Sequence, residues 1–199
     1  MLKNKSSIVS ALKYAAPYIR LFKNKIFVIK VGGELFTDKV LTRKLIEQIA
    51  ILQQLGIRII LIHGGGIQST QMASSLGIEA QFVEGRRITD AKSIEIATMI
   101  LNGKINTQIL AVAREFDLNA IGMSGIDAGL INAHRREALK TKDNKLIDYG
   151  FVGDIDSINT DLLEKQLSAN LIPVISPLTC DKNGVILNIN ADTVAAAIA

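Results

Sequence analysis

Two glycine-rich segments each follow an apolar run of the sequence. Gly32-Gly33 come directly after residues 26–31, and His63-Gly-Gly-Gly66 comes directly after residues 57–62. Glycine lets a ligand approach the backbone closely, and a loop that opens into a helix presents free N–H groups and the positive end of the helix dipole. The pattern predicts a site for phosphate or carboxylate. Neither loop matches the Walker A or GxGxxG pattern, and a plain tight turn is the alternative for each taken alone.

A lysine and a pair of arginines accompany these loops. Lys30 lies inside the first apolar run, just before Gly32-Gly33. It either extends to solvent or places a point charge on a phosphoryl group that is being transferred. Arg86-Arg87 either form a solvated surface pair or offer a planar guanidinium fork to a carboxylate. Both alternatives stay open on these residues alone.

Three polar side chains precede the last apolar stretch of the chain. Asn188, Asn190 and Asp192 alternate along the sequence just before an alanine-rich run. Capping of a helix that begins near residue 191 accounts for one of them, because an Asn or Asp side chain accepts hydrogen bonds from free N–H groups. The surplus predicts a polar ligand site or a group that orients a lysine.

An esterase is the competing interpretation of the HGGG segment at 63–66, since such a segment also forms the oxyanion loop of α/β-hydrolases. The best nucleophile candidate, Ser124, lies in a Gly-Met-Ser-Gly-Ile segment that lacks the second glycine of GxSxG. His134 follows closely, whereas hydrolases place an acid between the serine and a distant histidine. The pattern therefore argues against an esterase. The two histidines and one cysteine show no metal-ligand spacing, so no metal site is expected.

The composition is typical of a globular α/β protein. Of 199 residues, 48% are hydrophobic and 21% are charged, Trp is absent, and the formal net charge is +4. An aliphatic core of this kind is usual for a buried parallel sheet. No basic stripe interleaved with aromatic residues indicates nucleic-acid binding. The lone Cys180, the lack of a secretory signal and the shortness of the apolar runs predict a cytoplasmic protein that does not span a membrane.

Hydrophobic periodicity predicts the first elements. Residues 1–24 read as an amphipathic helix that Pro17 kinks or splits. The pattern predicts a strand at 26–31, a helix at 40–55, a strand at 57–62 and a helix at 67–76, in a βαβ layout with parallel strands. The apolar face expected for the helix at 40–55 carries Leu41, Leu45, Ile46, Ile49 and Leu52. Two further helices are expected on either side of Asn102-Gly103, at 91–101 and 105–116.

Shorter elements are expected in the rest of the chain. They are extended residues at 81–89, a strand at 120–123, a polar hairpin region at 129–152, a helix at 160–169, a strand at 171–175 and a turn at Asn183-Gly184. The last helix begins near residue 191 and reaches Ala199 without a Gly or Asn stop signal. We therefore expect the chain to be part of a larger protein.

Taken together, these segments resemble the amino acid kinase family, and within it the N-acetylglutamate kinases. The matching motifs stand in the family's order over nearly the whole chain: Tyr18-Ile-Arg20, Val28-Ile-Lys-Val-Gly-Gly33, His63-Gly-Gly-Gly66, Gly85-Arg-Arg-Ile-Thr-Asp90 and Asn188-Ile-Asn-Ala-Asp192. The resemblance implies an α/β fold, a three-layer αβα sandwich with a mainly parallel sheet, whose C-terminal nucleotide half is missing or incomplete here. It also implies a helical arm at 1–24 and a substrate-binding domain at 25–199.

The resemblance further implies transfer of the γ-phosphoryl group of ATP, bound with Mg²⁺, to the side-chain carboxylate of N-acetyl-L-glutamate, a step of arginine biosynthesis. Lys30 would stabilise the phosphoryl group, and Asp192 would orient the catalytic lysines. The implied binding residues are Gly65, Gly66, Arg87 and Asn188 for the substrate, and Gly32 and Gly33 for the nucleotide phosphates.

The sequence also leaves open a different substrate and a non-catalytic role, and it predicts an oligomer. Residues 122–153 differ from the commonest family pattern, so N-succinylglutamate or a carrier-linked aminoadipate is an alternative substrate. A non-catalytic lobe that binds an acyl-amino acid, or assembles with a partner, is the alternative of another class. The N-terminal helix resembles the arm that joins dimers into hexamers in arginine-inhibited family members, so a homo-oligomer is expected.

Overall fold

A parallel four-stranded sheet forms the centre of the protein. The computed structural model describes residues 2–78, 82–83, 86–140, 144 and 146–199. The strand order is β1-β2-β10-β5, and each neighbouring pair runs parallel. The strands are β1 (Ile26–Val31), β2 (Arg58–His63), β10 (Ile172–Ser176) and β5 (Ala120–Ser124). The predicted parallel pairing of the first two strands is confirmed.

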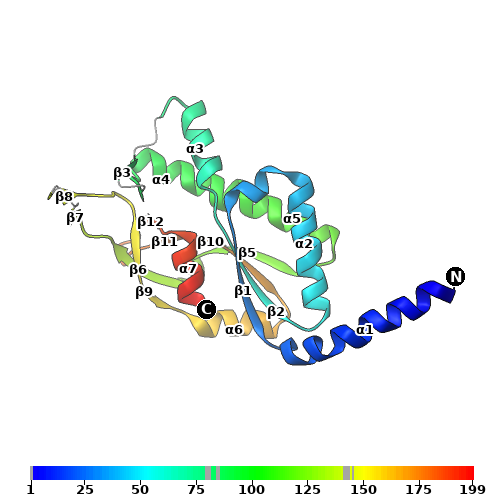
Figure 1. Cartoon of the computed structure of the whole chain (residues 1–199). Helices are drawn as coiled ribbons and strands as arrows, with labels where there is room; N and C mark the ends of the chain where they lie inside the picture. Colours follow the sequence, from blue (N-terminus) through cyan, green and yellow to red (C-terminus); the bar gives the residue numbers. More distant parts are fainter. Residues whose placement is uncertain (1, 79–81, 84–85, 141–143, 145) are drawn as a thin grey trace.

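Helices cover both faces of this sheet (Figure 1). Ile59 and Leu61 of β2 pack in one apolar cluster with the helices α2 (Lys39–Gln54) and α5 (Thr107–Glu115). The alternate residues Ile60 and Ile62 pack in a second cluster with α6 (Thr160–Ser168) and α7 (Ala191–Ile198). Successive side chains of a strand point to opposite faces. The continuous apolar run of β2 therefore supplies both cores, and the expected three-layer αβα sandwich is confirmed.

A second, mixed sheet packs beside the first. Its order is β12-β11-β6-β9, from β12 (Ile186–Asn188), β11 (Leu178–Cys180), β6 (Ile131–Arg135) and β9 (Gly153–Ile158). The antiparallel pair β11–β12 contains the expected Asn183-Gly184 turn, where Gly184 has φ 79°. This hairpin returns the chain to the edge of the central sheet, where residue 188 ends β12 and α7 follows.

The polar region at 129–152 is more ordered than a plain hairpin. β6 pairs antiparallel with β9, and a second short pair joins β7 (Leu139–Lys140) to β8 (Leu146–Ile147). Most of the expected tip, at 141–143 and 145, lies outside the described residues. The expected extended segment at 81–89 contains the pair β3 (Phe82–Val83) and β4 (Arg86–Arg87), while residues 81 and 84–85 also lie outside the described part.

The expected break at Asn102-Gly103 is wrong. The helical conformation continues from α4 (Ala91–Thr98) through a π-helical segment, η2 (Met99–Asn106), into α5. A π segment inserts extra residues without ending the helix, so a weak helix-forming pair can lie inside it. Four residues of η2 are buried against the core: Ile100, Leu101, Ile105 and Asn106.

The first helix, the buried face of α2 and the segment after Gly32 differ in detail from what the sequence pattern predicts. Of the two effects expected of Pro17, the split does not occur, because α1 extends from Leu2 to Phe22 with the proline inside it; a kink there stays a prediction. Ile46 and Ile49 of the expected apolar face of α2 are buried, but Leu41 is 47% exposed, and Thr42 and Ala50 are buried in addition. After Gly32 the chain forms a short 3-10 helix, η1 (Gly33–Thr37), before α2 begins at an Asp38 cap.

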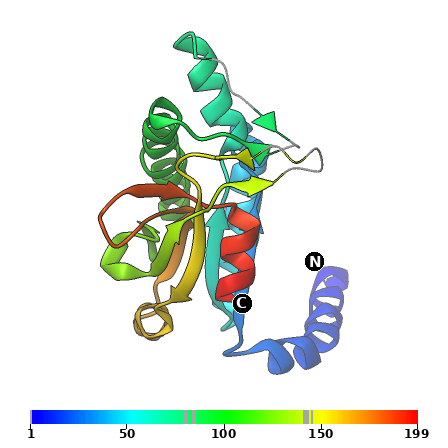
Figure 2. The ribbon, with the colours of Figure 1, turned by 90° about the vertical axis from the view of Figure 1, so that its left-hand side faces the viewer.

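Helix α1 stands away from the rest of the protein, as Figure 2 shows. Its apolar side chains are largely exposed: Ile8 55%, Leu12 60%, Tyr14 81%, Tyr18 66% and Leu21 61%. At its end, Phe22 packs edge-on against Phe27 of β1 with ring centroids 5.5 Å apart. None of the described helices is long and apolar enough to cross a membrane. The arm therefore adds little to the core of the folded domain.

Deletion of residues 1–20 tests this separation. At protein concentrations low enough for the monomer, we expect the melting temperature to fall by less than about 4 °C, because the deleted part buries little apolar surface within one chain. In a domain of this size, about 1 kcal/mol corresponds to 2–4 °C. The matched control is Ile109→Ala, since Ile109 is fully buried and its truncation should cost about 2–5 kcal/mol. A deletion that destabilises the domain as much as the control contradicts the expectation.

Candidate functional site

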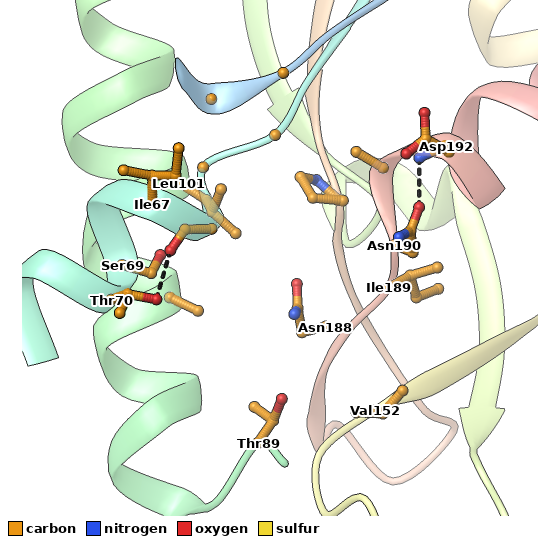
Figure 3. A pocket seen from close by; sticks show the side chains of 18 of the residues that line it. Ile67, Ser69, Thr70, Thr89, Leu101, Val152, Asn188, Ile189, Asn190 and Asp192 are labelled. Carbon is orange, nitrogen blue, oxygen red and sulfur yellow. Dashed lines mark hydrogen bonds between the residues drawn. The ribbon is translucent and has the colours of Figure 1, made fainter. Parts of the chain in front are cut away.

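A pocket of about 830 Å³ lies at the carboxyl edge of the central sheet. Its lining includes Lys30 of β1, both glycine loops, the start of α7 and side chains from α4. Figure 3 shows Asn190 and Asp192 on one side of the pocket and Ser69 and Thr70 on the other. The carboxyl ends of parallel strands are where ligands bind in open α/β sheets. The pocket therefore lies where the fold itself favours a binding site.

Lys30 and Asp192 form an ion pair inside this pocket. The Lys30 Nζ lies 3.0 Å from Asp192 Oδ1, and the two side chains are 30% and 69% exposed. Lys30 therefore neither lies free in solvent nor is buried without a partner. The pair links β1 to the first turn of α7, which are far apart in the sequence.

The three polar residues before α7 have different positions. Asn190 caps the helix, because its Oδ1 accepts hydrogen bonds from the N–H groups of Asp192, at 2.7 Å, and Thr193, at 3.3 Å. Asp192 pairs with Lys30, and Asn188 lines the pocket. In Figure 3 the side chain of Asn188 extends toward the open centre of the pocket. Capping thus uses one of the three, as expected, and leaves two for the pocket.

The two glycine loops touch each other. The N–H of Gly64 donates to the carbonyl of Val31 at 2.9 Å, and Gln68 Nε2 donates to the carbonyl of Gly33 at 2.5 Å. A Cβ added to Gly33 would lie 2.7 Å from the Cα of Gly65. This approach is possible only because both residues lack side chains. The loops therefore form one continuous backbone surface along the pocket.

Seven of the eight residues expected at the site line this one pocket. They are Lys30, Gly32, Gly33, Gly65, Gly66, Asn188 and Asp192. For Arg87 the structure gives the backbone, which forms β4 and pairs with Phe82 of β3. The side chain of Arg87 lies outside what the structure describes, so its expected contact with a carboxylate stays a prediction.

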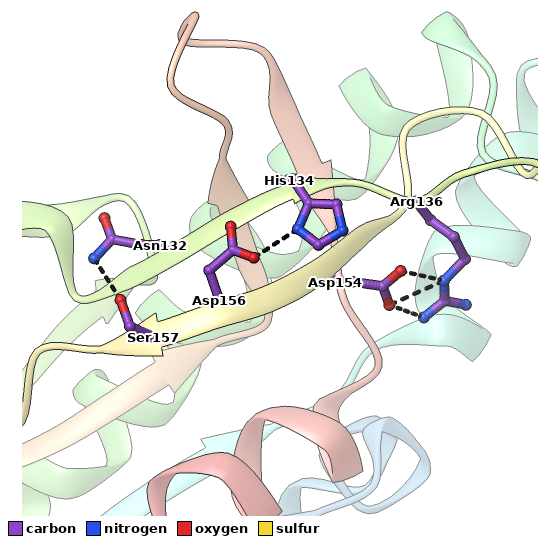
Figure 4. Close-up of polar contacts among 6 residues, drawn as sticks. All are labelled: Asn132, His134, Arg136, Asp154, Asp156 and Ser157. Atoms are coloured by element: carbon purple, nitrogen blue, oxygen red, sulfur yellow. Dashed lines mark hydrogen bonds and ion pairs between the residues drawn. The ribbon is translucent and has the colours of Figure 1, made fainter.

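Arg136, which no motif of the sequence singles out, also lines the pocket. Its Nε lies 3.0 Å from both carboxylate oxygens of Asp154 (Figure 4). These hydrogen bonds raise the pKa of Arg136, so the guanidinium stays charged. Arg136 directly follows β6 and Asp154 lies in β9, while the pairs His134–Asp156 and Asn132–Ser157 join the two strands themselves. Only the pairing register of the two strands brings these residues together, and no sequence spacing predicts that register.

His63, the first residue of the HGGG segment, lies beneath the second glycine loop. Its side chain is fully buried, and burial lowers the pKa of its imidazole from 6.5 to about 4. The ring is therefore neutral at physiological pH. It packs edge-on against Phe36, with ring centroids 6.2 Å apart.

Comparison with known proteins identifies the family of this fold and pocket. The model of the amino acid kinase family matches residues 25–199. The chain belongs to the amino acid kinase family. It is 42% identical over 195 residues to an acetylglutamate kinase of Myxococcus xanthus and 43% identical over 193 residues to one of Methanocorpusculum labreanum. Each match covers 96% of this chain but only 63% and 65% of those relatives, so the chain spans less than two thirds of their length.

Solved structures agree with membership of the amino acid kinase family. An N-acetylglutamate synthase from Neisseria gonorrhoeae, complexed with coenzyme A and N-acetyl-glutamate, superposes with a TM-score of 0.78 at 26% identity, covering 96% of this chain and 43% of that one. An isopentenyl phosphate kinase superposes with a TM-score of 0.54 at 16% identity, covering 86% of this chain and 65% of that one. The second likeness concerns the fold alone.

The two neighbouring glycines of the second loop allow a matched test. A Cβ on Gly65 would lie 2.5 Å from Ile105 Cδ1 and 2.6 Å from Leu101 Cδ2, whereas a Cβ on Gly66 would meet nothing within 4 Å. We expect Gly65→Ala to cost about 1–3 kcal/mol of unfolding free energy because it overpacks the site. Gly66→Ala should be close to neutral. Urea unfolding of both variants measures the difference, and equal stabilities would contradict the close packing at Gly65.

Proposed function

We propose that the protein transfers the γ-phosphoryl group of ATP to the side-chain carboxylate of N-acetyl-L-glutamate, a step of arginine biosynthesis. The observation that carries the proposal is the ion pair between Lys30 Nζ and Asp192 Oδ1, which are 3.0 Å apart beside the two glycine loops. The chain's 42–43% identity to acetylglutamate kinases supports the choice of reaction. Phosphoryl transfer needs positioning and charge stabilisation more than covalent chemistry from the protein, and this pocket offers both.

Each side chain at the pocket has a distinct proposed role. Lys30 neutralises charge on the phosphoryl group during transfer, and Asp192 holds the lysine in place when no phosphate is bound. The N–H groups of Gly65 and Gly66, at the start of the helix α3 (Gly66–Ser75), have no partner within the helix and bind the reacting carboxylate. Asn188 contacts the core of the acyl-amino acid from the opposite wall.

The first glycine loop and Arg87 have proposed roles in binding the nucleotide and the rest of the substrate. Gly32 and Gly33 approach the phosphates of ATP, and Mg²⁺ enters with the nucleotide because it is usually held by phosphates, carboxylates and water. Arg87 grips the α-carboxylate of the substrate with its guanidinium fork. In this proposal residues 25–199 are the substrate-binding domain and residues 1–24 are a separate arm.

The exposed arm supports a proposal about assembly and location. Its apolar side chains, including Leu12 and Tyr14 at 60% and 81% exposure, have nothing to pack against within the described residues of one chain. We infer that α1 packs on another copy of the chain in a homo-oligomer. The free Cys180 fits a reducing compartment, and we infer that the protein is cytoplasmic.

Calorimetry on the Lys30→Ala variant tests the proposed chemistry. We expect N-acetyl-L-glutamate to bind wild type and variant within about threefold of each other, because Lys30 acts on the phosphoryl group rather than on the substrate. In the intact protein, which includes the nucleotide half, phosphoryl transfer should fall by about 10²–10³-fold. Lys39→Ala, at an exposed lysine outside the pocket, is the control and should change neither quantity.

Other ligands separate the proposed substrate from its alternatives. N-succinylglutamate and Mg-ATP are titrated in parallel with N-acetyl-L-glutamate. If N-succinylglutamate binds and N-acetyl-L-glutamate does not, the assignment of N-acetyl-L-glutamate as the substrate is wrong. If the intact protein binds an acyl-amino acid but transfers no phosphoryl group, the result supports a binding lobe instead of a kinase.

Sedimentation velocity tests the proposed assembly. Wild-type protein should sediment as an oligomer, and deletion of residues 1–24 should shift it toward smaller species because the exposed face of α1 is removed. The Ile109→Ala variant controls for loss of assembly through general destabilisation. A monomer in both the intact and the shortened protein overturns the proposed role of the arm.

A further inference from the structure

We propose that His63 and Asn106 are positioning residues that aim the N–H of Gly65 into the pocket. The two side chains lie beneath the second glycine loop, 43 residues apart in the sequence. In the proposed function, this N–H binds the reacting carboxylate of the substrate. The identity of the ligand therefore rests on the proposed function. The arrangement of the two side chains stands on the geometry alone.

The neighbours of His63 determine which ring nitrogen carries the proton. Nδ1 lies 3.2 Å from the carbonyl oxygen of Gly64, and this oxygen can only accept a hydrogen bond. The proton must therefore be on Nδ1. Since the buried ring is neutral, Nε2 is an acceptor, and it lies 3.2 Å from Asn106 Nδ2.

The orientation of Asn106 is fixed in the same way. Its Nδ2 also lies 2.9 Å from the carbonyl of Val174 in β10, which again can only accept. The amide nitrogen therefore faces both acceptors, and the opposite assignment would place two oxygens together. A Cβ on Gly122 would lie 2.0 Å from Asn106 Oδ1, so the side chain fits only because β5 has a glycine there.

Holding the carbonyl of Gly64 also holds the next N–H group. The peptide unit between Gly64 and Gly65 is planar and trans, so its C=O and N–H point in opposite directions. The C=O is turned toward the buried imidazole, and the N–H of Gly65 is consequently turned away from it, in a residue that lines the pocket. Without the histidine contact, a glycine peptide could rotate at little cost, because neighbouring glycines restrict it weakly.

The π-helical segment brings Asn106 to this place. Asn106 is the last residue of η2 and is 5% exposed. Asn102, in the middle of η2, accepts a hydrogen bond from Ser176 Oγ at the end of β10. The segment is thus attached to the sheet at two points, and Asn106 projects beneath the glycine loop. Irregular helical segments of this kind are frequent at functional sites.

The histidine tautomer gives a direct test in the wild-type protein. Two-bond ¹H–¹⁵N correlation spectra of the imidazole rings at pH 7 distinguish a proton on Nδ1 from one on Nε2. The chain has two histidines, and the His134→Gln variant assigns the signals. We expect His63 to be neutral with its proton on Nδ1. A proton on Nε2, or a charged ring at pH 7, overturns the proposal without any variant at the site.

Replacement of Asn106 tests whether the arrangement affects ligand binding. In Asn106→Leu, and in the smaller Asn106→Ala, Nε2 loses its donor and the Nδ1–H signature should be lost or mixed. Affinity for N-acetyl-L-glutamate, measured by calorimetry, should fall about tenfold or more, the effect of one misaligned hydrogen bond to a charged group.

Thr179→Val is the matched control. Thr179 is fully buried and donates a hydrogen bond to the carbonyl of Ile131, and it does not line the pocket. We expect it to lower the melting temperature while leaving both the tautomer and the affinity unchanged. If the Asn106 variants lose the tautomer but keep the affinity, the positioning role is wrong. If wild type does not bind N-acetyl-L-glutamate, the proposed function fails, and the spectra still decide the His63–Asn106 arrangement.

Discussion

The register between β1 and β2 is the constraint on which the site depends. Val31 pairs directly with His63, so both strands end at the same level of the sheet. The N–H of Gly64 then donates to the carbonyl of Val31 at 2.9 Å and continues the ladder for one more residue. Both glycine loops therefore leave the sheet side by side. A shift of one residue would exchange the two faces of β2 and place His63 in the opposite apolar layer.

The continuous helical run α4-η2-α5 packs against the second glycine loop. Leu101 and Ile105 of η2 fill the space beside Gly65, where no Cβ could fit. Close packing of this kind resists small displacements, because protein interiors have few voids into which a side chain can move. The same segment that packs the loop also carries Asn106. Packing and hydrogen bonding thus act on the same short stretch of backbone, from the same element.

Sequence patterns predicted the parts of the fold that are set locally. Apolar runs ending in glycine gave the order and direction of β1 and β2, and the motif order brought seven of the eight expected residues to one pocket. Features set by tertiary contacts were missed. Asn102-Gly103 are weak helix formers that the packing of η2 retains in a helix, and Leu41 is exposed because α2 turns other residues inward. Arg136 reaches the pocket only through the register of β6 and β9.

Neutral and charged groups have separate places around the pocket. The buried polar side chains in the described part of the chain are all uncharged at neutral pH, including His63, Gln68 and Asn106. The charged ones, such as Lys30 and Asp192, remain partly exposed at the opening. A buried charge carries a large desolvation cost, whereas a buried neutral group needs only its hydrogen-bond partners. A rigid neutral frame can therefore hold the backbone donors without competing for an anion. In the proposed reaction, the partly solvated Lys30 exchanges Asp192 for a phosphoryl group at modest cost. If the buried groups were charged and the exposed groups neutral, a cation would be fixed beneath the glycine loop. The pocket would then have no mobile charge at its opening.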